Sequence, residues 1–174
     1  MFHMRWMPAL VLALAILTPG VALGADGEKA VVEVRMFNVH PDDPAQTMVF
    51  SPRVLWVQPG TTVRFVAVDP SHNTVSTPGM LPEGAAPWSG PFGKPFEVTV
   101  TLPGVYGYHC LAHRGMGMVG LIVVDGGEGA PNLKQAKAVK QTGGAAAAWA
   151  EIWGELGAEE GKAQGGVEAS GDKD

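Results

Sequence analysis

The sequence predicts an all-β fold, an antiparallel β-sandwich, followed by two α-helices. Two observations lead to this prediction. Between residues 31 and 124, short runs of alternating or β-branched residues are separated by proline and glycine turns, and no helical period is present. Beyond residue 125, apolar residues recur at helical spacing among good helix formers.

The strand candidates follow one another along the first part of the chain. They lie at residues 31–37, 48–50, 54–57, 61–68, 96–102, 105–110 and 118–124. Most alternate apolar and polar side chains with a period of two, which is typical of strands with one buried face. The intervening residues 76–95 are rich in proline and glycine, so we expect a long loop there.

The two helix candidates occupy residues 132–141 and 145–156, with Gly143-Gly144 between them. Trp149, Ile152 and Trp153 form an aromatic and apolar stripe in the second helix, which we expect to pack on the sandwich. Residues 126–157 are therefore a predicted helical extension. Residues 158–174 are rich in glycine and charge, and we expect them to be disordered.

The first 24 residues have the pattern of a secretory signal peptide. Arg5 precedes an apolar stretch, and Ala22-Leu-Gly24 supplies small residues at the cleavage position. Pro19 and Gly20 interrupt the stretch before it reaches the roughly 20 apolar residues of a membrane span. We expect cleavage near Ala25, a sandwich domain over residues 25–125, and no membrane span in the exported protein.

Charge excludes one class of partner. The chain has a formal net charge of −5 and no cluster of lysine and arginine. Nucleic-acid binding is therefore not expected.

Cys110 is the only cysteine of the chain. In an exported protein an unpaired cysteine suggests a reactive or metal-binding thiol. His113, Met116 and Met118 follow it within nine residues, and His72 lies upstream. A thiolate, two imidazoles and a weak thioether are the ligands of a mononuclear blue-copper site. This chemistry alone does not choose between Met116 and Met118.

Strand alternation and glycine content indicate how these ligands could converge. Tyr108 should share the inner face of its strand with Cys110, and His109 should point outward as a surface residue. Gly115 and Gly117 allow the following loop to turn tightly. A copper ion with four protein ligands has no open position for a substrate, so we expect an electron carrier and not an enzyme. The alternative is a copper-binding or delivery protein, which would favour exposed methionine and histidine arrays.

Several motifs resemble those of the pseudoazurins, which are cupredoxins and small periplasmic electron carriers of bacteria. The motifs are Met48-Val-Phe-Ser-Pro52, Pro59-Gly60, His72-Asn73, Met80-Leu-Pro-Glu-Gly84, Pro103-Gly-Val-Tyr106 and Cys110-x₂-His-x₂-Met-Gly-Met118. The resemblance extends from about residue 31 to 124 and continues more loosely into residues 132–135. It implies a cupredoxin Greek-key β-sandwich with two C-terminal helices.

The resemblance also implies a copper site and its surroundings. The ligands would be His72, Cys110, His113 and Met118, with Met116 in an apolar rim. Asn73 would tether the ligand loop and donate a backbone N–H to the thiolate, although Leu111 lacks the hydroxyl that relatives often carry. The implied function is periplasmic transfer of one electron, by a monomer, between partners such as cytochrome c, copper nitrite reductase or nitrous oxide reductase.

The docking surface departs from the family pattern. His113, Arg114 and Met116 would form the electron port, but Pro70 and His109 stand where relatives often have lysines. Arg114 and Lys94 are the remaining basic candidates, so electrostatic steering should be weak. Of the other histidines, His3 leaves with the signal peptide and His40 is expected to be a solvated loop residue.

Overall fold

The computed structural model describes residues 30–126 and 129–168. Within these ranges the chain forms eight strands, one short 3₁₀ helix and two α-helices. The elements are β1 (Val31–Val39), β2 (Thr47–Ser51), β3 (Val54–Val57), β4 (Thr61–Ala67), β5 (Val75–Ser76), β6 (Phe96–Val100), β7 (Gly104–His109), η1 (Arg114–Met116), β8 (Val119–Val124), α1 (Leu133–Ala138) and α2 (Gly144–Glu168). The predicted signal peptide lies outside the described residues.

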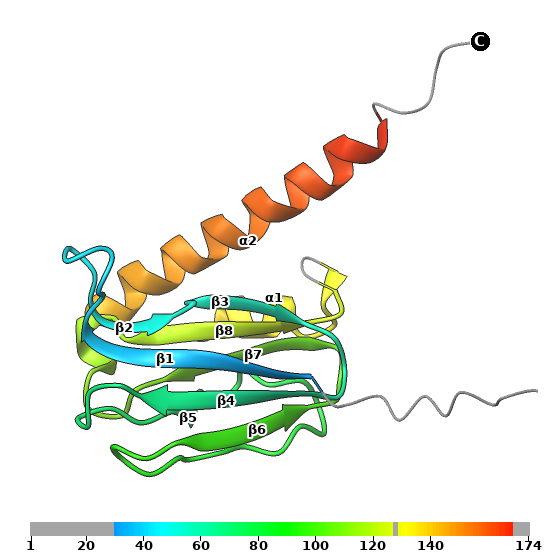
Figure 1. Cartoon of the computed structure of the whole chain (residues 1–174). Coiled ribbons are helices and arrows are strands. Elements are labelled where there is room, and N and C mark those ends of the chain that lie inside the picture. Colours follow the sequence, from blue (N-terminus) through cyan, green and yellow to red (C-terminus); the bar gives the residue numbers. More distant parts are fainter. Residues whose placement is uncertain (1–29, 127–128, 169–174) are drawn as a thin grey trace, which may run out of the picture.

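The strands form two packed sheets, as expected (Figure 1). One sheet has the order β2-β1-β4-β6 and the other β3-β8-β7-β5. The predicted antiparallel pairing is confirmed for four strand pairs and wrong for two, because β1 runs parallel to β4 and β3 runs parallel to β8. Each parallel pair joins strands that are distant in the sequence, so no local pattern of turns reveals its direction.

The inner faces of the two sheets enclose the main hydrophobic core. Its members are apolar and aromatic side chains that alternate along the strands, among them Val34, Met36, Phe50, Val63, Phe65, Tyr106, Tyr108 and Ile122. Cys110 and Met118 lie at the edge of this same buried set, and both are fully inaccessible. The sandwich therefore carries the predicted ligand cysteine on its inner face, together with Tyr108.

A second core lies on the outer face of the β3-β8-β7-β5 sheet. The two helices cover this face with buried side chains, and Trp149, Ile152 and Leu156 of α2 are at most 2% exposed. As predicted, Trp153 continues this stripe by stacking on Trp149. Every residue of β7 and β8 is consequently buried, so this sheet is covered on both faces.

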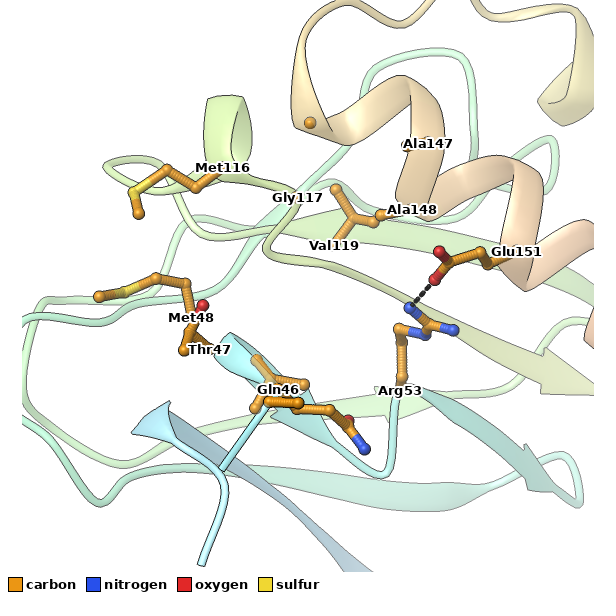
Figure 2. Close-up of a pocket in the computed structure, with 13 residues that line it drawn as sticks. Gln46, Thr47, Met48, Arg53, Met116, Gly117, Val119, Ala147, Ala148 and Glu151 are labelled. Carbon is orange, nitrogen blue, oxygen red and sulfur yellow. Dashed lines mark hydrogen bonds and ion pairs between the residues drawn. The ribbon is translucent and has the colours of Figure 1, made fainter. Parts of the chain in front are cut away.

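Polar contacts fix the extension to the sandwich. Asn132, just before α1, accepts from Val105 N–H and donates to Val105 carbonyl, at 2.9 and 2.8 Å. On α2, Glu151 forms an ion pair with Arg53 at 2.8 Å (Figure 2). The extension is thus attached to the sandwich at the start of β7 and at the turn between β2 and β3.

Helix α2 is longer than the sequence indicated. It continues to Glu168, past residue 157 where the helical extension was predicted to end and the tail to begin. Alanine, glutamate, lysine and glutamine in this stretch are good helix formers. Their helix propensity outweighs the unfavourable propensity of the glycines. Within the described residues, no helix has both the length and the apolar content of a membrane span.

Candidate metal centre

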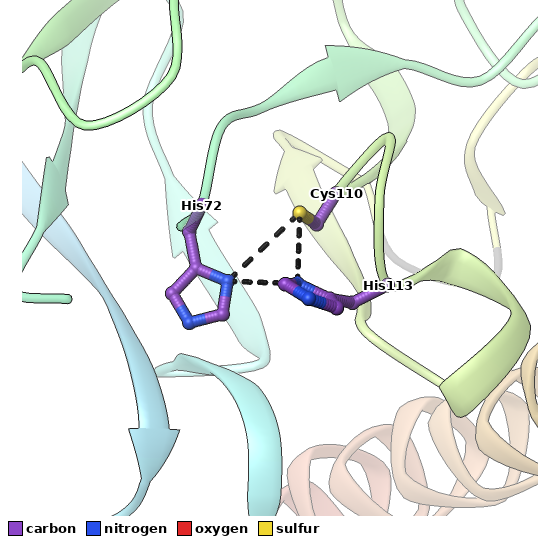
Figure 3. A group of neighbouring side chains, drawn as sticks. All are labelled: His72, Cys110 and His113. Atoms are coloured by element: carbon purple, nitrogen blue, oxygen red, sulfur yellow. Dashed lines mark hydrogen bonds between the residues drawn. The ribbon is translucent and has the colours of Figure 1, made fainter. Parts of the chain in front are cut away.

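Three predicted ligands meet at one end of the sandwich (Figure 3). Cys110 directly follows β7, and His113 lies three residues further on, just before η1. His72 comes from the segment between β4 and β5. The chain returns at once to β8, and Cys110 N–H donates to Met118 carbonyl at 3.0 Å. A rigid strand pair therefore closes the ligand loop at its base.

The donor atoms form a compact triangle. Nδ1 of His72 is 3.1 Å from Nδ1 of His113, and the Cys110 Sγ is 3.9 and 3.5 Å from these two nitrogens. A point equidistant from the three atoms lies about 2 Å from each, which is the distance at which imidazole and thiolate bind first-row metal ions. The set fits one metal ion, and its soft thiolate favours copper.

Burial shields the donors from water. Cys110 and His72 are fully inaccessible, whereas His113 is partly exposed. Burial lowers the pKa of His72, and the nearby His113 lowers it further, although Asp69 acts in the opposite direction. The lowered pKa keeps the imidazole neutral, which is the form that binds a metal.

The two candidate thioethers differ sharply in position. Met118 is fully buried and belongs to the same packed set as Cys110. Met116 is 62% exposed and lies on the outer side of the loop, as Figure 2 shows. Ligand chemistry alone does not choose between the two methionines. Burial favours Met118 as the axial ligand.

Asn73 ties the His72 segment to the ligand loop. Its Oδ1 accepts a hydrogen bond from Leu111 N–H at 3.0 Å and lies 3.7 Å from the Cys110 Sγ. Its Nδ2 donates to Gly90 carbonyl at 3.0 Å. The expected tether is present although Leu111 has no hydroxyl, because the backbone N–H of Leu111 supplies the donor. A bond from Asn73 N–H to the thiolate stays a prediction.

The prediction that His109 is a surface residue is wrong. Its side chain points away from the Cys110 thiol but is only 5% exposed. Its Nδ1 lies 2.9 Å from the hydroxyl of Thr77, a residue of the proline-rich loop that covers this face of β7. Burial and the nearby Arg114 lower the pKa of His109 to about 4, so it is neutral near pH 7. His109 therefore contributes no positive charge to the surface.

The surface around His113 is mainly apolar. Leu111 and Met116 are 61% and 62% exposed. Arg114 is partly buried, and its guanidinium donates to the Gln141 side chain at 2.9 Å. Lys94 is exposed. Outside the donor set, His40 is less solvated than expected, since its Nε2 lies 3.0 Å from Ser51 Oγ.

Sequence reasoning missed Thr77, Gln141 and Gly144. Thr77 contacts the side chain next to the ligand cysteine, and Gln141 and Gly144 contact the ligand loop itself. Thr77 has no pattern that could have revealed its partner. The Gly143-Gly144 pair did carry a signal, because paired glycines before a helix allow close approach of another backbone.

Comparison with known proteins agrees with this geometry. A family model of copper-binding proteins, the plastocyanin/azurin family, matches residues 37–125. The pseudoazurin of Paracoccus pantotrophus is 38% identical over 140 residues, which cover 80% of this chain and 88% of that protein. Among solved structures, a pseudoazurin from Sinorhizobium meliloti is 41% identical and superposes with a TM-score of 0.68, covering 73% of this chain and 96% of the other.

A third relative gives a similar match. The native pseudoazurin of Hyphomicrobium denitrificans is 38% identical, with a TM-score of 0.65, and covers 74% of this chain and 97% of that one. Fold and site together define a blue-copper protein of the cupredoxin class, with copper as cofactor. The chain belongs to the plastocyanin/azurin family of copper-binding proteins, in which it is pseudoazurin-like. It is accordingly an electron-transfer protein.

Proposed function

We propose that His72, Cys110, His113 and Met118 hold a single copper ion, which supplies one-electron Cu(II)/Cu(I) chemistry when bound. The observation that supports this most strongly is the donor triangle, with sides of 3.1, 3.5 and 3.9 Å. His72 comes from the segment between β4 and β5, whereas Cys110 and His113 share the loop between β7 and β8, and the donors already lie close enough to bind with little rearrangement. A preformed set of this kind keeps the structural change between oxidation states small.

His113 is the electron port of the proposed function. It is the one member of the donor triangle that is partly exposed, and its imidazole links the buried thiolate region to the surface. Leu111 and Met116 give the surface around it an apolar contact area. Small apolar contacts of this kind suit brief encounters with redox partners. The remaining ligands are enclosed, so water and substrates have no access to them.

The biological setting is a further part of the proposal. The signal-like N-terminus favours export to the periplasm. The proposed protein acts there as a monomer. Likeness to pseudoazurins favours redox proteins as partners, with cytochrome c, copper nitrite reductase and nitrous oxide reductase as the specific candidates.

The proposal is tested by copper titration of the mature chain, followed by visible spectroscopy and thermal unfolding. We expect one copper per chain, an intense thiolate-to-copper band in the oxidised form, and its loss on reduction by ascorbate. Copper should also raise the melting temperature, because the ion binds the folded state preferentially. Cys110→Ala should remove the band and the copper-dependent rise in melting temperature, while the apoprotein stays folded.

The alternative, copper delivery, predicts a different outcome of the same experiment. A delivery protein would transfer its Cu(I) rapidly to an acceptor and would show no intense band in the oxidised form. A colourless copper-loaded protein in both redox states would contradict the electron-carrier function.

A further inference from the structure

The C-terminal extension contacts the ligand loop through the N-terminal end of α2. Gly144, the first residue of this helix, lies against the backbone of the loop between His113 and Met118. A Cβ atom on Gly144 would be 2.6 Å from the Met116 carbonyl carbon and 2.8 Å from Gly117 N. Because real Cβ atoms do not approach backbone atoms so closely, the contact depends on glycine.

The contact is reciprocal. Gly117, which has a positive φ of 99°, would place a Cβ 3.2 Å from Gly144 carbonyl oxygen and 3.5 Å from Ala148 Cβ. Figure 2 shows Gly117 beside the first turns of α2, close to Ala148. Gly117 in the loop and Gly144 and Ala148 in the helix thus let helix and loop meet with almost no side chain between them.

A hydrogen-bonded side chain adds a second attachment. Arg114 in η1 donates to Gln141 Oε1 at 2.9 Å, and Gln141 Nε2 lies 3.5 Å from the sulfur of Met80. Met80 is fully buried in the core beneath the helices. The loop segment that carries η1 is therefore connected through Gln141 to the interior of the molecule.

Helix α2 is held in place on both of its sides and cannot easily move away from the loop. Trp149, Ile152 and Leu156 bury its inner face, and the ion pair of Arg53 with Glu151 holds its outer side. The loop, by contrast, exposes Leu111 and Met116. Any conflict at the Gly144 contact would therefore displace the loop and the two ligands at its ends.

The geometry points to the C-terminal extension as a clamp on the copper-ligand loop, with Gly144 and Gln141 as positioning residues for His113 and Met118. This inference rests on the ligand assignment proposed above. The clamp holds these two ligands at fixed positions in both oxidation states and slows the loss of the ion. It gives the helical extension a role in electron transfer as well as in covering the sheet.

The test compares four copper-loaded full-length proteins: the parent chain, Gly144→Ala, Gln141→Ala and the control Gly154→Ala. Gly154 lies on the same helix, and a Cβ there would meet no atom within 4 Å beyond its own neighbouring helix backbone. Three quantities are measured: the visible spectrum of the oxidised protein, its midpoint potential, and the rate at which the reduced protein loses Cu(I) to bathocuproine disulfonate. Circular dichroism of the apoproteins reports whether each variant folds.

We expect Gly144→Ala to lose Cu(I) about 10- to 100-fold faster than the parent, the range seen when residues that support metal ligands are changed. Its visible bands and midpoint potential should shift, which a purely structural role would not cause. Gln141→Ala should show a smaller change in the same direction, and Gly154→Ala should match the parent in all three quantities.

Parent-like values in both Gly144→Ala and Gln141→Ala would overturn the clamp. Should Gly144→Ala fail to fold, Gln141→Ala decides alone, and parent-like copper loss in that variant would refute the proposal. A parent chain without the thiolate band would instead defeat the ligand assignment, so the two failures are distinguishable.

Discussion

Two methionines of one loop, separated by a single glycine, have opposite environments. Met118 is fully buried beside Cys110, whereas Met116 is 62% exposed. The turn at Gly117, with its positive φ, reverses the chain between them. A residue with a Cβ would be strained at that position, so glycine allows the buried thioether to point inward. The backbone of the loop thus directs one of the two thioethers, that of the proposed axial ligand Met118, toward the core.

We predict that Met118→Gln lowers the midpoint potential, because an amide oxygen is a harder ligand than a thioether and favours Cu(II). The shift should be at least about 60 mV, which is a tenfold change in a one-electron equilibrium constant. Protein-film voltammetry measures it, with Met116→Gln as the matched control. A larger effect of Met116→Gln on the spectrum and potential would reverse the assignment.

The hydrogen bonds of Asn73 give a second prediction at this scale. Asn73→Ala leaves Leu111 N–H and Gly90 carbonyl without their partner, and the residue is only 2% exposed. We expect a loss of about 1–3 kcal/mol in the free energy of unfolding of the apoprotein, measured by urea denaturation. Asn73→Asp keeps the acceptor for Leu111 and should recover part of the loss. Equal stability of Asn73→Ala and the parent would show that the tether is not stabilising.

At the scale of elements, the β3-β8-β7-β5 sheet is enclosed by the opposite sheet on one face and by the helices on the other. Its central strands are therefore tightly packed. Tyr108 of β7 pairs with Gly120 of β8, and its ring occupies the space next to that glycine. Burial raises the pKa of Tyr108, so the phenol stays protonated in the core beside the copper site. The ring also contacts Phe50 and Phe65 edge to face.

We expect Gly120→Ala to destabilise the protein by about 1–3 kcal/mol, because the added methyl group would overlap the Tyr108 ring in a fully packed core. Thermal or urea unfolding of the apoprotein measures the change. Gly154→Ala on the open side of α2 is the control, and it should leave stability unchanged or raise it by up to about 1 kcal/mol through helix propensity. If Gly120→Ala leaves the free energy of unfolding unchanged, the aromatic side chains of the core can shift to accommodate the added methyl group.

At the scale of the whole molecule, the port has a mixed and weak charge. Burial and His113 lower the pKa of His72 while the nearby Asp69 opposes them, and burial lowers the pKa of His109 with a further contribution from the nearby Arg114. Arg114 also bonds Gln141, and the neutral His109 adds no charge. Leu111 and Met116, at 61% and 62%, are large hydrophobic side chains that are mostly exposed beside these residues. Short-range apolar contact, and not long-range electrostatic attraction, should therefore guide the docking of a redox partner.

Electron exchange with cytochrome c should consequently depend little on salt. Between low and physiological ionic strength we expect the bimolecular rate constant, measured by stopped flow, to change less than about tenfold, the lower limit for strongly steered association. Leu111→Asp, which places a charge in the apolar rim, should slow the reaction without altering the visible spectrum. A steep fall of the parent rate with salt would reveal a charged docking surface elsewhere.

Local patterns predicted the strands that have one exposed face. In β1, β4 and β6 the alternation of apolar and polar residues matches the alternation of buried and exposed side chains. The ligand candidates were predictable for a related reason, since three of the four lie within nine residues and their chemistry is specific to copper. Residues 31–124 therefore contained most of the information on fold and site.

Long-range contacts account for what the sequence did not reveal. His109 is buried because the loop carrying Thr77 and the helical extension cover the outer face of β7, and nothing near His109 indicates this cover. The parallel pairing of β1 with β4 and the contact of Gly144 with the ligand loop also join distant segments. Helix α2 extends past residue 157 because good helix formers in that stretch favour the helix despite its glycines.

The most direct test of the central claim is X-ray absorption spectroscopy of the copper-loaded protein in both oxidation states. A preformed, closed donor set predicts two nitrogen neighbours at about 2.0 Å and one sulfur at about 2.3 Å, with the same neighbours before and after reduction. A solvent oxygen bound to copper, or loss of the sulfur neighbour in either state, would contradict the account.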